Sequence, residues 1–444
     1  MSNIQFSGQS ILKKVIFVTF VIGYLSTLAL TNINSDQDFF KSDYIRFSNH
    51  CYNDNIKTVK IHVLDDPLSI PIIELSGSDK LLLSFDELNG EVKDYTYRFY
   101  HCTSKWEKSD LFTSDYIDGF EENQIRDAEM SFNTKQSYIH YSLSFPNDDI
   151  KLLLSGNYVI AVYDAYEEEK LVLTRRFHVI EPGATIAGEA KRATNLDFHR
   201  SHHEVDFTFW SNIPINDPYQ DIKICVIQNG RWDNVISDIS PKYIKGNEFI
   251  YDYEDEILFP AAGEFRHFNS KDIKFASEGI KSIQYRELFY HFDLEKSELR
   301  RFKVYKYKED INGKLFIDVA NGQDNELEAD YVISHFSLSM DAPVVDGNIY
   351  VFGELSNWEF PMINRMSYNY EKKAYELEIP LKQGYYDYTY AFIRDGEVSA
   401  DIGYIEGNHY ETENDYHIFI YYRDNSSRYD KLIGVSTVNT TRKN

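Results

Sequence analysis

The stretch KDYTYRFYH, from Lys93 to His101, alternates between apolar aromatic and polar side chains. Successive side chains of a β-strand point to opposite faces, so an extended chain places Tyr95, Tyr97 and Phe99 on one side. The other side carries residues that water solvates well. The stretch therefore predicts a strand with one buried face.

The same period of two recurs on both sides of this stretch, in short segments separated by Gly, Asn and Asp. Such runs are typical of strands joined by turns, and no stretch of the chain shows a sustained helical period. The composition agrees, because the 35 Tyr and 30 Phe residues suit pleated, half-buried surfaces. We expect an all-β protein built from β-sandwiches. Further predicted strands lie at 57–63, 80–85, 137–145, 157–164, 171–180, 203–210, 221–228, 247–253, 287–294, 329–338, 347–360, 373–397 and 415–422.

A chain of 444 residues is too long for one hydrophobic core. The segment EPGA at 181–184 has the composition of a linker. We predict three consecutive sandwiches of immunoglobulin-like or early-set type after a signal peptide. The predicted boundaries are 1–35 for the signal peptide, 45–182 for the first domain, 184–325 for the second and 327–436 for the third.

The N-terminus has the layout of a secretory signal peptide. Lys13 and Lys14 precede an apolar run from Val15 to Leu30, and the small residues Thr27 and Ala29 offer a cleavage site. A membrane anchor is the alternative, although the run is shorter than the roughly 20 residues that a span requires. We expect export from the cytoplasm.

Charge and cysteine content restrict the class of partner. The formal net charge of −25 repels nucleic acid and anionic membrane surfaces, so we expect membrane association only through a protein partner. Three cysteines are too few for a disulfide scaffold. Cys51 and Cys102 could pair, while Cys225 reads as a buried strand residue.

Candidate catalytic and metal-binding residues are few. His101 and Cys102 are neighbours, so a strand directs them to opposite faces and they cannot act as a nucleophile and base couple. His199, His202 and His203 lack the spacing of a zinc-binding helix. We therefore predict no enzyme activity, no cofactor and no metal, with a hydrolase that uses these histidines as a rival hypothesis.

The segment from Ser104 to Asn133 has little period and is long for a connection within a compact domain. Long segments of this kind often form binding surfaces. We expect its aromatic residues to contact a protein partner: Trp106, Phe112, Tyr116 and Phe120. The alternative is that they pack beneath the loop.

The C-terminal part resembles the early-set immunoglobulin-like domains that include glycogen- and starch-binding modules. The match spans Tyr350 to Gly396 and rests on Asn357, Trp358, Gly384, Tyr386, Tyr388, Asp395 and Gly396. In the sugar-binding members the counterpart of Trp358 stacks on glucose with a second Trp, where this chain has Val398. The resemblance implies a β-sandwich. It leaves a secreted glycan-binding protein as the alternative function, with Trp358 and Asn414 as contacts.

The chain as a whole resembles the type IX secretion system plug proteins of Bacteroidetes-type bacteria. The resemblance includes the segments 263–275, 327–338 and 428–435. In the first domain it rests on Glu74, Leu75, Tyr97, Tyr100, His101, Cys102, Trp106, Tyr116, Gly119, Phe120, Ser131, Phe132, Pro146, Asn147, Leu154, Gly156 and Tyr158.

This resemblance implies a non-catalytic periplasmic protein at the inner face of the outer membrane. Members of the family bind the periplasmic mouth of the large outer-membrane barrel that exports type IX cargo. They close the barrel when no cargo shuttle occupies its lateral opening. The resemblance therefore implies that barrel as the partner. It implies no catalytic residues in this chain.

Overall fold

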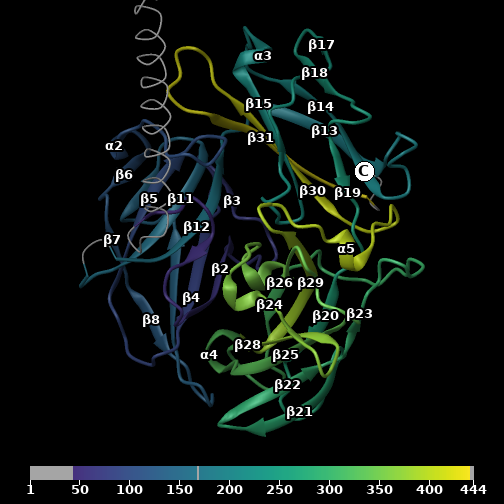
Figure 1. The fold of residues 1–444 in the computed structure, drawn as a ribbon. Coiled ribbons are helices and arrows are strands. Elements are labelled where there is room, and N and C mark those ends of the chain that lie inside the picture. Colours follow the sequence, from purple (N-terminus) through teal and green to yellow (C-terminus); the bar gives the residue numbers. More distant parts are fainter. Residues whose placement is uncertain (1–43, 168–169, 441–444) are drawn as a thin grey trace, which may run out of the picture.

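The computed structural model describes residues 44–167 and 170–440. They fold into three β-sandwich lobes arranged as a triangle (Figure 1), so that each lobe touches the other two. The first lobe is purple to blue in the figure, the third is mostly green, and the second combines teal strands with two yellow ones. The predicted all-β fold class is confirmed.

The first lobe comprises two facing sheets, with short pieces at one end: β6 (Ile117–Gly119) pairs with β10 (Ile150–Leu152) and follows α2 (Thr113–Tyr116). The aromatic face predicted for 93–101 meets the opposite sheet, where Phe85 and Tyr141 stack. One sheet contains, in order, β1 (His50–Cys51), β12 (Leu171–Ile180), β11 (Gly156–Asp164), β5 (Tyr95–Cys102) and β7 (Asn123–Ile125), and β3 (Ile72–Glu74) runs parallel to β12. The other contains β2 (Ile56–Val63), β4 (Leu81–Glu87), β9 (Ile139–Phe145) and β8 (Asp127–Met130).

The second lobe is assembled from two distant parts of the chain. One sheet contains β13 (Ala184–Arg192), β14 (His202–Ser211), β18 (Glu248–Tyr251) and β17 (Tyr243–Lys245), with β19 (Leu258–Pro260) beside β14. The other contains β16 (Ile236–Ser237), β15 (Ile222–Gln228), β30 (Asp415–Tyr422) and β31 (Lys431–Asn439), and α3 (Pro218–Asp221) leads into β15.

The third lobe lies between these two parts in sequence. Its short helical pieces are α4 (Asn325–Glu328), η1 (Glu354–Ser356), η2 (Met362–Asn364) and α5 (Gly403–Glu406). One group of strands contains β20 (Arg266–Asn269), β29 (Gly384–Arg394), β24 (Leu315–Ile317) and β26 (Gly347–Phe352). The facing sheet contains β21 (Ile280–Arg286), β22 (Phe289–Leu294), β25 (Tyr331–Ser339), β28 (Ala374–Lys382) and β27 (Ser367–Asn369), with β23 (Ser297–Glu298) beside β25.

Strand pairing does not follow the predicted boundary between the second and third domains at 325–327. Within the predicted second domain, β20 to β24 pair with strands of the third lobe. Within the predicted third domain, β30 and β31 return to the second lobe, where Cys225 of β15 faces Phe419 of β30 in register. The third lobe is thus inserted into the second. Alternation within a strand shows which face is buried, but it does not identify the pairing partner.

The predicted signal peptide at 1–35 lies outside the described residues. Within the residues that are described, no helix has both the length and the apolar character needed to cross a membrane.

Candidate docking tip and the junctions between lobes

The segment that links β5 to β7 forms one end of the first lobe. Phe112 precedes α2 and Phe120 follows β6, and their side chains are 73% and 78% exposed. A hydrogen bond from Thr113 to Glu121, 3.4 Å, joins the two ends of this turn. We call residues 112–121 the docking tip, because it carries two large exposed aromatic side chains.

Two of the four aromatic residues predicted for a partner surface are buried instead. Tyr116 lies in the core of the first lobe and its hydroxyl donates to the Phe99 carbonyl, 3.1 Å. Trp106 is buried at the boundary with the second lobe. Trp106 and Tyr116 therefore pack beneath the loop, as the alternative interpretation states. Phe112 and Phe120 remain available to a partner.

Trp106 belongs to an aromatic junction between the first and second lobes. Its ring centroid lies 5.2 Å from Trp232 and 5.1 Å from His178, and the Arg176 guanidinium carbon lies 4.4 Å from it. His178 also stacks on Phe419 of β30 at 4.7 Å. Burial lowers the pKa of His178 to about 3, so the imidazole is neutral at physiological pH and packs as an aromatic ring.

A second junction, between the first and third lobes, is built around a buried ion pair. Asp86 of β4 and Lys382 of β28 are fully buried, and their charged atoms lie 2.8 Å apart. The Tyr331 hydroxyl of the third lobe donates to Asp86 Oδ2 at 2.6 Å. His140 contacts the other oxygen of Asp86, Oδ1, at 2.7 Å. The Lys382 ammonium also lies 4.4 Å from the centroid of the Tyr138 ring. One Asp86 oxygen is thus bonded across the boundary by Lys382 and Tyr331, and the other is bonded by His140 within the first lobe.

The electrostatics of this junction favour the ionised pair. Burial by itself raises the pKa of a carboxyl group, but the Lys382 ammonium and the hydrogen bond to His140 outweigh it and hold the pKa of Asp86 below its usual value. Burial and the Asp86 charge raise the pKa of Tyr331 far above its usual value, so Tyr331 remains a donor. The contacts of Asp86 with Lys382 and Tyr331 can form only while the first and third lobes are together.

The third junction, between the second and third lobes, contains Trp358. A Cβ added to Gly230 of the second lobe would lie 2.2 Å from its Nε1, and one added to Gly313 of the third lobe would lie 2.4 Å from its Cη2. The ring also meets Phe265 and Phe352 edge-on. Trp358 thus fills the seam between the two lobes.

Both residues predicted as glycan contacts, Trp358 and Asn414, are engaged in contacts within the protein. The Trp358 ring is partly buried and packs against Phe265 and Phe352 in the seam between lobes. Asn414 is buried, accepts a hydrogen bond from Asn229 at 2.9 Å and donates to the Ala261 carbonyl at 2.9 Å. Trp358 thus packs between the second and third lobes, whereas Asn414 bonds to residues of its own lobe, the second.

The three histidines proposed for zinc are each engaged in local structure. His203 is buried between the Tyr416 hydroxyl, 2.8 Å, and the Tyr410 carbonyl, 2.9 Å, which occupy both ring nitrogens. His202 contacts the Ser201 hydroxyl and His199 contacts the Ala193 carbonyl, each at 2.8 Å. The structure does not bring them together as a ligand set.

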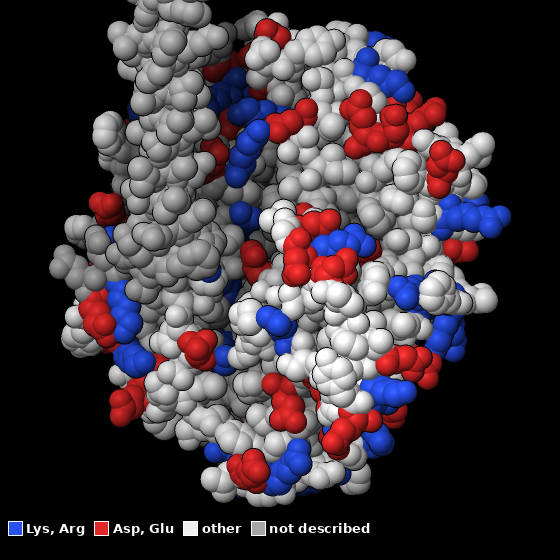
Figure 2. Space-filling view, in the orientation of Figure 1, with Lys and Arg blue, Asp and Glu red and all other residues white. Residues whose placement is uncertain are grey.

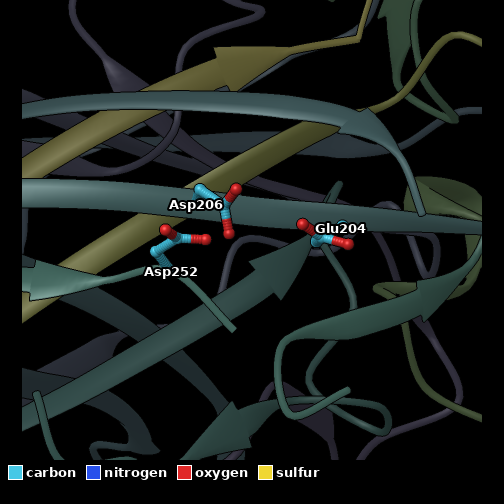
Figure 3. A group of neighbouring side chains, drawn as sticks. All are labelled: Glu204, Asp206 and Asp252. Atoms are coloured by element: carbon cyan, nitrogen blue, oxygen red, sulfur yellow. The ribbon is translucent and has the colours of Figure 1, made fainter. Parts of the chain in front are cut away.

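Within residues 44–167 and 170–440, one group of three acidic side chains lies close enough to hold a cation: Glu204, Asp206 and Asp252. Figure 3 shows Asp206 and Asp252 directed toward each other, with Glu204 farther along β14. The Lys191 ammonium contacts Asp206 and lies 3.2 Å from Glu204. This side chain already supplies the positive charge, so the group is an ion-pair cluster on the second lobe.

The three cysteines are unpaired in the structure. Cys51 lies on β1 and Cys102 on β5, and β12 and β11 separate them in the sheet. Three strand spacings amount to about 14 Å, whereas a disulfide needs Cα atoms within about 7 Å. The pairing considered from the sequence is excluded by this sheet order. Cys225 is a buried strand residue, as predicted.

Trp106 and Trp358 were singled out from the sequence for other roles, but three charged residues of the junctions were not singled out. Arg176, Asp86 and Lys382 each occupy ordinary strand positions. The one available signal is weak: Arg176 and Lys382 interrupt or end strongly apolar runs, which is also true of many solvated strand residues.

The fold and its junctions define a class: a large all-β protein whose three sandwiches are fixed to one another and whose exposed aromatic tip can contact a partner. Comparison with known proteins narrows this class. The model of the type 9 secretion system plug protein first domain matches residues 56–181. The chain belongs to the type 9 secretion system plug protein family.

A solved structure extends the similarity beyond the first lobe. The crystal structure of a hypothetical protein from Parabacteroides merdae is 36% identical, with a TM-score of 0.87, and the alignment covers 89% of this chain and 100% of that one. No curated protein matches the chain. Family membership connects the chain to a plug role in type 9 secretion and to the cell envelope.

Proposed function

We propose that this chain is a non-catalytic plug that binds and closes the periplasmic mouth of the outer-membrane type IX translocon barrel. The observation that carries the proposal is the match of residues 56–181 to the plug family. The junctions between lobes support it, because a plug that closes a wide pore must not bend.

Rigidity is supported by polar contacts at all the boundaries between lobes. The buried Asp86–Lys382 pair joins the first and third lobes. Asp430 of the second lobe accepts from the Ser104 amide of the first at 2.8 Å. Arg231 of the second lobe donates to the Ala400 carbonyl of the third at 3.0 Å. Separation of any two lobes would leave buried polar groups without partners, which is costly.

The docking tip is the surface that we propose for barrel contact. Phe112 and Phe120 are large, exposed and held by the ordered turn around α2. Aromatic side chains on a fixed backbone lose little conformational entropy on binding and often dominate the energy of an interface. The tip also belongs to the lobe that the family model matches.

Recovery of the barrel from outer-membrane extracts tests the proposal. The tagged wild-type chain should retain a very large barrel protein. Phe112→Ser combined with Phe120→Ser should lower the recovery at least about tenfold, because loss of two interface anchors commonly has that effect. A matched control replaces two exposed aromatic residues elsewhere, Tyr166→Ser with Tyr370→Ser, and should retain the barrel.

Failure of the wild type to retain any barrel would overturn the proposed function. Equal retention by the tip variant and the control would overturn the assignment of the tip.

The absence of catalysis and the periplasmic location are parts of the same proposal. The histidines considered for a hydrolase already serve as hydrogen-bonding partners within the second lobe. Stoichiometric zinc in the purified chain would contradict the non-catalytic proposal. Fractionation should place the chain in the periplasm, with the segment 1–35 removed, and mass spectrometry of the N-terminus checks this.

A further inference from the structure

One segment of the third lobe departs strongly from the acidic character of the chain. Residues 296–308, KSELRRFKVYKYK, contain six Lys or Arg and one Glu, although the whole chain carries a net charge of −25. Aromatic and β-branched residues alternate with the lysines in its second half. We call residues 300–310 the strap; it contains five Lys or Arg and two acidic residues, Glu309 and Asp310.

The strap has no strand pairing from 304 to 310, and most of its side chains are exposed. It spans a hollow of about 660 Å³, lined in part by Arg266, Lys296 and Tyr388. In Figure 1 it is the green loop at the right-hand edge near β23, and Figure 2 shows blue side chains along that edge. Its position makes it accessible to a flat surface.

The ends and middle of the strap are nevertheless fixed. Arg300 and Arg301 donate their backbone amides to the Ile405 carbonyl at 2.8 and 3.0 Å, and Asp310 accepts from the Phe265 amide at 2.7 Å. Between these ends, the Tyr305 hydroxyl contacts the Glu264 carboxylate and donates to the Glu411 carbonyl at 3.0 Å. Hydrogen bonds therefore fix the strap at both ends and in its middle.

The side chains directed away from the lobe combine apolar groups and ammonium groups. Phe302 is 85% exposed and Val304 is 95% exposed. The Phe302 ring is held by the Arg301 guanidinium, 4.7 Å away, which lies at the same distance over Tyr404. Lys306 has no ion pair with any described residue, and Lys303 and Lys308 pair with Glu298 and Glu278 at the edge of the strap.

We infer that the strap binds the anionic phosphate headgroups of a membrane surface. Protruding apolar side chains insert at the boundary between headgroups and acyl chains, while lysines beside them pair with lipid phosphates. A protein partner would need a preformed groove for the exposed side chains of Phe302 and Val304. A bilayer interface accepts them without a preformed pocket. The Debye length is only about 8 Å at physiological ionic strength, so distant acidic residues of the chain act weakly on phosphates at the strap.

This inference goes beyond plugging of the barrel: it gives the third lobe its own contact with the membrane around the barrel. It revises the expectation that the chain meets a membrane only through its partner. Lipid binding by the strap rests on the proposed function only in one respect: the envelope location brings the chain near a membrane.

Flotation with lipid vesicles tests the inference. The exported chain, with the same N-terminus verified in every variant, is mixed with phosphatidylcholine vesicles with and without phosphatidylglycerol. The wild type should float with the anionic vesicles and lose this binding in high salt. Phe302→Ser with Lys303→Gln and Lys306→Gln should reduce binding at least tenfold, since each lysine near an anionic surface contributes about fivefold.

A matched control removes one exposed aromatic residue and two lysines from a turn of the same lobe: Tyr370→Ser with Lys372→Gln and Lys373→Gln. It should bind vesicles like the wild type. Equal flotation of the strap variant and the control, or strap-dependent binding of polyglutamate without binding of vesicles, would overturn the inference.

Retention of the barrel separates the two proposals. The strap variant should still recover the barrel in detergent extracts, and the Phe112 and Phe120 variant should still float. If the wild type fails to recover the barrel, the vesicle experiment still decides whether the strap binds lipid.

Discussion

At the scale of single residues, burial decides how charged groups behave in this protein. Asp387 on β29 is fully buried and accepts backbone hydrogen bonds from Ile311 at 2.5 Å and Gly313 at 3.3 Å. Burial, followed by the nearby Asp310 charge, raises the pKa of Asp387 to about 8. Asp387 is therefore largely protonated at neutral pH.

This shift predicts a pH dependence of stability. The folded protein holds a proton on Asp387 that the unfolded chain releases near pH 4, so the free energy of unfolding should fall as pH rises through the window from about 4 to 8. The contribution of one such group is about 1.4 kcal/mol per pH unit. Asp387→Asn mimics the protonated carboxyl group and should flatten the dependence between pH 6 and 8, about the upper half of this window.

Urea unfolding at several pH values measures this effect. Asp401→Asn, which changes an exposed aspartate of the same lobe, is the control and should keep the wild-type slope. Identical slopes for Asp387→Asn and the wild type would show that Asp387 does not carry the proton.

At the scale of elements, the C-terminal hairpin is a structural part of the second lobe. β30 lies between β15 and β31 in one sheet, and seven of its eight residues are buried. Its Tyr416, Ile418 and Ile420 enter the same core as Phe207 and Phe249 of the opposite sheet. A strand at a sheet centre cannot be removed without exposing both neighbours.

Truncation after Thr412 should therefore unfold the second lobe, because it removes six of the seventeen buried residues of a core whose other members lie up to some 200 residues earlier. Near-ultraviolet circular dichroism should show a loss of aromatic packing. Limited proteolysis should show cleavage within 184–260. A chain that ends after Thr440 retains β31 and serves as the control. Protection of 184–260 in the shorter chain would contradict the inserted arrangement.

At the scale of the whole molecule, we expect the lobes to behave as one body because polar groups are shared between them. Arg175 of the first lobe donates to Asn357 of the third at 2.9 Å, and Tyr421 of the second donates to Asn157 of the first at 2.8 Å. Buried hydrogen bonds of this kind specify one relative placement of lobes.

Lys382→Met tests this coupling. It removes the cation and leaves Asp86 buried without its ion-pair partner, which should cost about 3–5 kcal/mol of unfolding free energy. Thermal unfolding should change from a single transition to separate ones as the third lobe detaches from the first. Lys372→Met removes an exposed pair with Glu376 and should change stability by less than about 0.5 kcal/mol. An unchanged single transition in Lys382→Met would show that the pair does not couple the lobes.

Several features followed from the sequence because they depend on neighbouring residues. The alternation at 93–101 identified the buried face of β5, and the irregular stretch after Ser104 identified the end of the lobe that carries the docking tip. The predicted all-β fold and plug family are confirmed. Within the tip, the sequence could not separate Trp106 from Phe112, since both are aromatic residues in an irregular stretch.

Local alternation of side chains thus determined the strands and their buried faces, and long irregular motifs determined the family. Tertiary structure alone decided that β30 joins β15, that Trp358 fills a seam, and that Lys382 meets Asp86. These contacts join residues that are far apart in the chain. Their partners are selected by which faces meet when the lobes assemble, and no local pattern records that choice.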